Sequence, residues 1–149
     1  MKPIEILTLG MGAIGSLYSS RLQSNLTRLH CLTRHETHYI RKNGITIKNP
    51  DNSTTIFNPD FTYDKIDDVK IIPDYIIIST KVLPSINLVD DIGKVISKKT
   101  TLVLIQNGIN IEDSYTKAFS QNEIISALAF VCVAKVKTGM VHHQDYGRL

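Results

Sequence analysis

The sequence predicts an α/β fold of the doubly wound type, in which a mostly parallel sheet carries helices on both faces. Two observations lead to this prediction. First, short apolar runs such as Tyr75–Ile78 and residues 101–105 show no polar alternation, which is typical of strands buried on both faces of a parallel sheet. Second, segments with apolar residues at helical spacing lie between such runs, so the chain consists of repeated strand–helix–strand units.

The first of these units occupies the N-terminal part of the chain. Ile4–Leu9 is a short apolar run that ends at a glycine, and it predicts a strand. A second strand is expected over residues 29–33. The helix between the two strands has an apolar stripe made of Ile14, Leu17, Tyr18 and Leu22.

Two small hairpins are also expected. Residues 44–48 and Thr54–Phe57 flank the segment Asn49-Pro50-Asp51-Asn52, whose turn chemistry predicts a hairpin at a sheet edge. Near the end of the chain, Lys137-Thr138-Gly139 is expected to turn the preceding strand back into residues 140–143.

The second strand–helix–strand unit begins with the strand Tyr75–Ile78. A helix is expected over residues 85–97, with Pro84 suited to its first turn. The apolar stripe of this helix consists of Ile86, Val89, Ile92 and Ile96. The strand over residues 101–105 completes the unit.

Two further elements are expected after this unit. A helix over residues 111–119 has Asn110 as its predicted N-cap, with Asp113 in a capping-box-like position. The apolar residues 124–134 predict one more strand. Because the sequence shows no repeats, low-complexity tracts or linkers, residues 1–149 are expected to form one domain.

The composition is that of an ordinary globular domain, with 42% hydrophobic and 21% charged residues. The formal net charge is +3, but the lysines are scattered, so no nucleic-acid partner is expected. No apolar stretch approaches the roughly 18 residues of a membrane span, and no signal peptide is evident, which predicts a cytoplasmic protein. Cys31 and Cys132 lie inside apolar runs and are expected to be reduced thiols in the core.

The histidines do not predict a metal site. His30, His35 and His38 share neither strand spacing nor helical spacing. The neighbours His142 and His143 are expected to point to opposite faces of a strand. We therefore expect no bound metal.

A glycine motif carries the functional prediction. Gly10-Met11-Gly12-Ala13-Ile14-Gly15 has the spacing G-x-G-x-x-G directly after a predicted strand and at the start of a predicted helix. Gly10 allows the tight turn, Gly12 lets the backbone approach a pyrophosphate, and Gly15 lets helix and strand pack closely. The phosphates are expected to meet free N–H groups and the positive end of the helix dipole. The motif predicts a Rossmann-type dinucleotide-binding domain.

The residues after the second strand predict which dinucleotide is bound. NAD-binding domains usually carry Asp or Glu there to hold the ribose 2′-hydroxyl, whereas this chain has Thr33-Arg34-His35. Arg34 can donate charge-assisted hydrogen bonds to a 2′-phosphate, each worth about 1.5–3 kcal/mol, or roughly a 10- to 100-fold preference for NADP over NAD. Glu36 leaves NAD as an alternative, because it could hold the 2′-hydroxyl if the strand ends later.

Further motifs follow in a specific order. They are Gly10 to Gly15, Thr33-Arg34, residues 41–47, residues 74–79 leading into Thr80-Lys81, and residues 104–108, which end in Gln106-Asn107-Gly108. Residues 139–149 match more loosely. In this order the motifs resemble the ketopantoate reductase family, also called 2-dehydropantoate 2-reductases, over nearly the whole chain.

This resemblance implies the NADPH-dependent reduction of a 2-keto acid, ketopantoate to pantoate, in pantothenate and coenzyme A biosynthesis. It implies that Lys81 lies near cofactor and substrate in a supporting catalytic role, with Thr80 beside it in the cofactor site. It also implies that Asn107 contacts the nicotinamide ribose and the substrate. Lys81 and Asn107 follow predicted parallel strands, whose carboxyl ends form the ligand edge of such a sheet.

The family also implies a helical second domain, which holds the general-acid lysine and which residues 1–149 do not contain. The chain alone is therefore expected to be an inefficient catalyst. An apolar surface left open where that domain docks would favour self-association, such as a homodimer. The chain departs from the family at Asn110, where a glycine is usual, and at residues 142–145, where a His-Thr-Gly-like run is usual.

Two other functions remain open at the level of the sequence. One is a related dehydrogenase that acts on another small 2-keto acid or on a glycerol-phosphate type of substrate. The other is a non-catalytic NADP-binding module that senses redox state or regulates a partner. All three functions share the cofactor domain and differ in what a second domain contributes.

Overall fold

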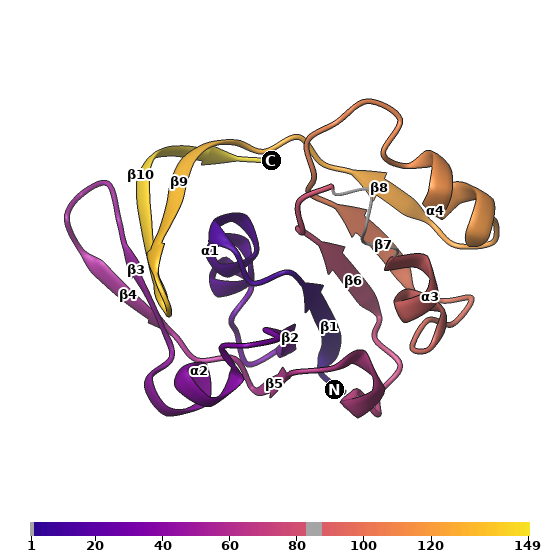
Figure 1. The fold of residues 1–149 in the computed structure, drawn as a ribbon, viewed down its shortest axis with the longest axis horizontal. Helices are drawn as coiled ribbons and strands as arrows, with labels where there is room; N and C mark the ends of the chain where they lie inside the picture. Colours follow the sequence, from indigo (N-terminus) through magenta and orange to yellow (C-terminus); the bar gives the residue numbers. More distant parts are fainter. Residues whose placement is uncertain (1, 83–87) are drawn as a thin grey trace.

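The computed structural model describes residues 2–82 and 88–149 and confirms the α/β fold (Figure 1). Six parallel strands form the main sheet in the order β5-β2-β1-β6-β7-β8. Their bounds are β1 (Ile4–Leu9), β2 (Thr27–Leu32), β5 (Phe61–Tyr63), β6 (Tyr75–Ile78), β7 (Thr101–Leu104) and β8 (Ile124–Ser126). The strand order reverses between β1 and β6, and open sheets of this kind bind ligands at the carboxyl ends of the strands near this point.

Helices cover both faces of the main sheet (Figure 1). They are α1 (Ala13–Arg21), α2 (Thr37–Asn43), α3 (Leu88–Gly93) and α4 (Asp113–Ala118), with a short 3-10 helix η1 (Ile66–Asp68). Along β1, Ile6 shares a core cluster with Leu17 of α1, whereas Leu7 shares the opposite cluster with Ile92 of α3. Both faces of β1 are therefore buried, which explains why its sequence shows no polar alternation.

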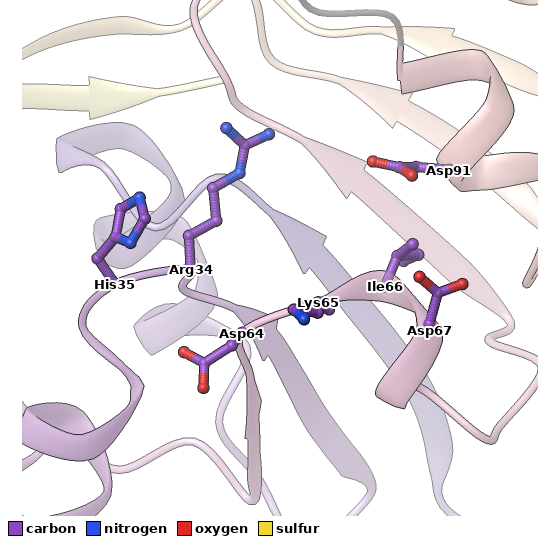
Figure 2. Close-up of a pocket in the computed structure, with 7 residues that line it drawn as sticks. All are labelled: Arg34, His35, Asp64, Lys65, Ile66, Asp67 and Asp91. Atoms are coloured by element: carbon purple, nitrogen blue, oxygen red, sulfur yellow. The ribbon is translucent and has the colours of Figure 1, made fainter.

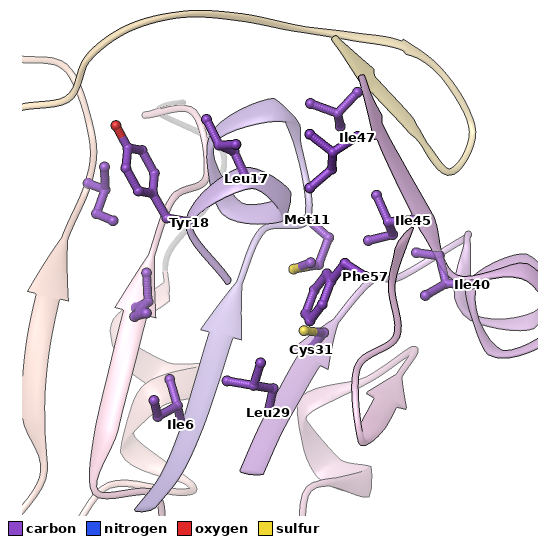
Figure 3. Packing of buried hydrophobic residues seen from close by; sticks show 13 residues of the cluster. Ile6, Met11, Leu17, Tyr18, Leu29, Cys31, Ile40, Ile45, Ile47 and Phe57 are labelled. Atoms are coloured by element: carbon purple, nitrogen blue, oxygen red, sulfur yellow. The ribbon is translucent and has the colours of Figure 1, made fainter. Parts of the chain in front are cut away.

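A second, four-stranded sheet lies over α1 (Figures 1 and 3). Its strands run in the order β4-β3-β10-β9, with bounds β3 (Ile45–Lys48), β4 (Thr54–Phe57), β9 (Phe130–Lys137) and β10 (Met140–Arg148). Both predicted hairpins are confirmed as β3–β4 and β9–β10, and a parallel pairing of β10 with β3 joins them. Ile47 and Phe57 pack in one cluster with Met11 and Leu17, so α1 is buried between the two sheets.

The prediction of one strand over residues 124–134 is wrong. β8 ends at Ser126 and pairs with β7 in the main sheet, and the chain then crosses to the second sheet, where β9 begins at Phe130. Residues 127–129 between the two strands are also apolar. The single polar residue Ser126 is therefore the only sequence signal in residues 124–134 where the chain changes sheets.

The helix predicted over residues 85–97 is shorter than expected. α3 ends at Gly93, and Lys94 and Val95 form turns instead of a further helical turn. Glycine is a poor helix former, which explains the early end. The predicted start of this helix, with Pro84, lies outside the described residues.

The helix predicted over residues 111–119 also has a different start. α4 begins at Asp113, and Glu112 occupies the cap position without a side-chain hydrogen bond. Asn110 does not cap the helix, because it lies further from the first turn and adopts the left-handed conformation with φ 56°.

Among the described residues, no helix has the length and hydropathy needed to cross a membrane.

The two cysteines differ in their surroundings. Cys31 is fully buried in β2, and this burial raises the pKa of its thiol. Cys132 is exposed on β9, so the prediction of a core thiol is wrong for this residue. β9 buries only one face: Val131 and Val133 pack toward the core cluster, whereas Cys132 between them is exposed.

Candidate functional site

The glycine loop connects β1 to α1 at the carboxyl edge of the main sheet. Gly10 has φ 97°, and a Cβ at this position would lie 2.7 Å from Cγ2 of Thr80. A Cβ at Gly15 would lie 2.0 Å from the carbonyl oxygen of Gly10. The packing of the protein itself therefore requires glycine at both positions.

Gly12 has different surroundings from the other two glycines. Its φ of −77° suits any residue, and a Cβ there would meet no atom of the described residues within 4 Å. The fold does not need glycine here, and the space beside it is open. This space lies at the first turn of α1, where N–H groups lack partners within the helix and the helix dipole favours an anion. A phosphate group fits this position.

Hydrogen bonds between neighbouring strand ends hold the loop in place. The Ser79 hydroxyl, just after β6, donates to the carbonyl oxygen of Gly10 at 2.7 Å. The Gln106 side-chain amide, just after β7, donates to the carbonyl oxygen of Thr80 at 2.7 Å and to its hydroxyl at 3.1 Å. Sequence reasoning missed these two roles. The available signal was that Ser79 and Gln106 are polar residues directly after predicted strands.

Arg34 lines a cavity of about 580 Å³ next to the carboxyl end of β2 (Figure 2). The residues that line this cavity are Arg34, His35, Asp64, Lys65, Ile66, Asp67 and Asp91. Arg34 is exposed, and within residues 2–82 and 88–149 its guanidinium has no hydrogen bond or ion pair. Figure 2 shows the guanidinium pointing away from Asp64. It is therefore available to an anionic group of a ligand.

Two carboxylates of this cavity have a cationic partner. Lys94 Nζ lies 2.9 Å from Asp67 Oδ1 and 3.7 Å from Asp91 Oδ1. The hydrogen bond from Lys94, together with its charge, lowers the pKa of Asp67. The exposed Arg34 guanidinium therefore lies in one cavity with Asp67 and Asp91, whose negative charges are partly neutralised by Lys94.

Lys81 and Asn107 reach the same edge of the sheet. Lys81 follows β6, Asn107 follows β7, and both residues are exposed. Their neighbours Thr80 and Gln106 are hydrogen-bonded to each other, but the described part of the chain gives Lys81 and Asn107 no such bond. The structure thus brings the two residues to one edge without joining them.

Glu36 has a partner that the sequence did not suggest. β2 ends at Leu32, earlier than the NAD alternative requires, and Glu36 is the residue directly before α2. Lys135 of β9 forms an ion pair with Glu36 and donates a hydrogen bond to the carbonyl oxygen of Met11 at 3.1 Å. Sequence reasoning missed Lys135, because it lies on the second sheet and far along the chain from the glycine loop.

Two histidines have structural partners. His30 is buried and lies between the Glu5 carboxylate and the Tyr63 hydroxyl. His143 is buried in β10, with Nε2 2.8 Å from the carbonyl oxygen of Tyr146. Within the described ranges, no group of three His, Cys, Asp or Glu residues is arranged to hold a metal ion.

The sequence matches a known family and a curated relative. A family model described as ketopantoate reductase PanE/ApbA matches residues 6–149. A 2-dehydropantoate 2-reductase from Nostoc sp. is 27% identical over 146 residues, which are 95% of this chain and 44% of the relative.

Solved structures share the fold. A 2-dehydropantoate 2-reductase from Methylococcus capsulatus is 32% identical, with a TM-score of 0.89 over 97% of this chain and 47% of the other. A D-mandelate dehydrogenase solved with NADH is 20% identical, with a TM-score of 0.81 over 94% of this chain and 45% of the other, which shows a common fold alone. The chain spans less than half the length of each of these relatives.

Proposed function

Because the chain belongs to the ketopantoate reductase family, we propose that it forms the cofactor-binding part of an NADPH-dependent oxidoreductase that reduces ketopantoate to pantoate. The open space at Gly12, which the fold leaves unfilled at the start of α1, is the observation that carries this proposal. NADPH, when bound, supplies the hydride for the keto carbon. The chain's own residues hold the cofactor and orient it.

The pyrophosphate is held by the glycine loop in this proposal. The first N–H groups of α1 donate to the phosphate oxygens, and the helix dipole adds to the attraction. Met11, Ala13 and Ile14 contribute backbone to this cradle, and Gly12 keeps side-chain atoms out of it. The hydrogen bond from Ser79 to Gly10 keeps the cradle rigid before the cofactor arrives.

Lys81 and Asn107 act at the nicotinamide end in this proposal. Asn107 holds the nicotinamide ribose and the substrate, and Lys81 places a positive charge near the keto acid, where it stabilises the developing alkoxide. Lys81 follows β6, which neighbours β1 in the sheet, and Asn107 follows β7, one strand further along. Both residues are exposed and able to reorient toward a ligand. Thr80, fixed by Gln106, sets the position of the segment that carries Lys81.

Arg34 selects NADP over NAD in this proposal, and a substitution tests it. Arg34→Ala should weaken NADPH binding by roughly 10- to 100-fold, because charge-assisted bonds to the 2′-phosphate are lost, and should leave NADH binding nearly unchanged. Dissociation constants from fluorescence titration measure both effects. Arg28→Ala removes the same charge at the opposite end of β2 and should change neither constant. Equal loss of NADPH and NADH binding in Arg34→Ala would contradict the assignment.

We also propose that a helical second domain completes the enzyme and supplies the general acid. Two observations support this. The relatives are more than twice as long as the part matched here. An apolar cavity of about 540 Å³ opens on the α1 face of the sheet, lined by side chains such as Ile6, Ile77 and Val103 and by Leu149. Exposed apolar surface of this kind marks an interaction site.

This open apolar surface predicts the behaviour of residues 1–149 alone. The chain should self-associate as its concentration rises, because a second copy can cover the cavity, and light scattering measures the mass. Tyr75→Lys places a charge at the rim, where Tyr75 is 40% exposed, and should shift the chain toward the monomer. Val136→Lys, on β9 outside the cavity, serves as the matched control. A wild-type chain that stays monomeric would argue against this docking surface.

A further inference from the structure

The ion pair between Lys135 and Glu36 links three segments that surround the glycine loop. Lys135 belongs to β9 of the second sheet, Glu36 lies at the start of α2, and the same Lys135 ammonium donates to the carbonyl oxygen of Met11. The Lys135 side chain is 30% exposed and that of Glu36 is 20% exposed. Lys135 as a whole residue is exposed and Glu36 is half-buried, so the ion pair is partly shielded from water, which strengthens it relative to a fully exposed pair.

Glu36 is the acidic residue that follows β2 most closely, since Thr33, Arg34 and His35 precede it. A carboxylate in this region accepts hydrogen bonds from the ribose 2′-hydroxyl in NAD-binding domains. The same carboxylate repels a 2′-phosphate, because both groups are negative. Where the Glu36 carboxylate points therefore matters for the choice between NAD and NADP.

We propose that Lys135 is a positioning residue that sets this choice: it holds Glu36 against the glycine loop, so that Arg34 alone faces the ribose 2′ position. The proposal rests on the proposed binding of a nicotinamide dinucleotide. Lys135 acts through Glu36, neutralising its charge and fixing its direction. Its bond to Met11 anchors the pair to the backbone of the loop itself.

Binding titrations with NADPH and NADH test the proposal on the 149-residue chain. Lys135→Met frees Glu36 and should lower the ratio of NADPH affinity to NADH affinity by roughly tenfold, about 1.4 kcal/mol. Lys135→Arg keeps the ion pair and should retain the wild-type ratio. Lys137→Met removes another lysine of β9, which a β-bulge separates from Lys135, and should also retain it.

The double variant separates positioning from direct contact. In Glu36→Gln/Lys135→Met no carboxylate remains to be held, so the affinity ratio should return to near the wild-type value. If the double variant instead shows the same loss as Lys135→Met, Lys135 binds the phosphate itself and the proposal is overturned. Thermal unfolding of every variant shows whether the fold is intact. A partial loss of folded protein lowers the apparent affinities for NADPH and NADH equally, so their ratio does not change.

Failure of this inference differs from failure of the proposed function. A wild-type chain that prefers NADPH, together with a Lys135→Met variant of unchanged ratio, overturns the role of Lys135 alone. A wild-type chain that binds neither nucleotide overturns the proposed function, and the inference falls with it.

Discussion

Gly12→Asp should greatly weaken dinucleotide binding while leaving the stability of the fold nearly unchanged. The new side chain would enter the open space at the first turn of α1, where it would place a negative charge against the pyrophosphate. Two like charges about 4 Å apart cost about 4 kcal/mol at an effective dielectric constant of about 20, so binding should weaken roughly 100- to 1000-fold. Aspartate is also a favoured N-cap, and Gly12 occupies the N-cap position of α1 with a suitable backbone.

Gly15→Ala is the matched comparison within the same loop. Its Cβ would lie 2.0 Å from the carbonyl oxygen of Gly10 and 2.4 Å from Oγ of Ser79. This overlap should lower the free energy of unfolding by roughly 1–3 kcal/mol or more. Urea unfolding and NADPH titration of both variants separate the two roles. If Gly12→Asp loses as much stability as Gly15→Ala, or binds NADPH like the wild type, the assignment of the open space to a phosphate is wrong.

His30→Leu should produce a large loss of stability at a site outside the glycine loop. His30 Nε2 lies 2.7 Å from the Glu5 carboxylate, and the side chains are only 2% and 8% exposed. The other ring nitrogen lies 2.8 Å from the Tyr63 hydroxyl, and the ring stacks on Phe61 at 4.7 Å between centroids. Leucine would leave the buried Glu5 carboxylate without this hydrogen bond, with Arg28 Nη1 at 3.9 Å as a remaining cationic contact, and the loss should cost about 1–3 kcal/mol or more.

The double variant Glu5→Leu/His30→Leu should recover much of this loss. Replacing both members of a buried polar pair by apolar groups of similar size is often nearly neutral. Urea unfolding measures the free energy in each variant, and the pair lies on β1 and β2 away from the glycine loop, so NADPH binding by folded protein should not change. A double variant as unstable as His30→Leu would mean that the loss comes from packing against Phe61, not from the missing hydrogen bond to the Glu5 carboxylate.

Much of the architecture follows from local sequence. Ile4–Leu9 and Tyr75–Ile78 form strands with the predicted bounds, because unbroken apolar runs are stable only where both faces of a sheet are covered. The glycine loop lies where predicted. Gly10 adopts a positive φ, and Gly15 lies too close to the carbonyl oxygen of Gly10 for a Cβ, so both positions require glycine. These features depend on a residue's own conformation or on neighbours close in the chain.

Other parts could not be predicted from local pattern. Residues 124–134 are apolar except for Ser126, yet they belong to two sheets, because the change of sheet depends on which strand each part pairs with. Asn110 resembles a helix cap but adopts a left-handed turn, since asparagine suits both roles. Cys132 lies in an apolar run and is exposed, because β9 buries only the face that packs toward α1.

The sequence by itself determined the parallel sheet, the glycine loop and the cation Arg34 that follows β2, because each depends on residues adjacent in the chain. Only the tertiary structure decided that β3 and β10 join two hairpins into a sheet over α1. That sheet brings Lys135 to Glu36 and to the glycine loop. The physical reason is that this ion pair joins residues 99 positions apart, which periodicity and spacing along the chain do not encode.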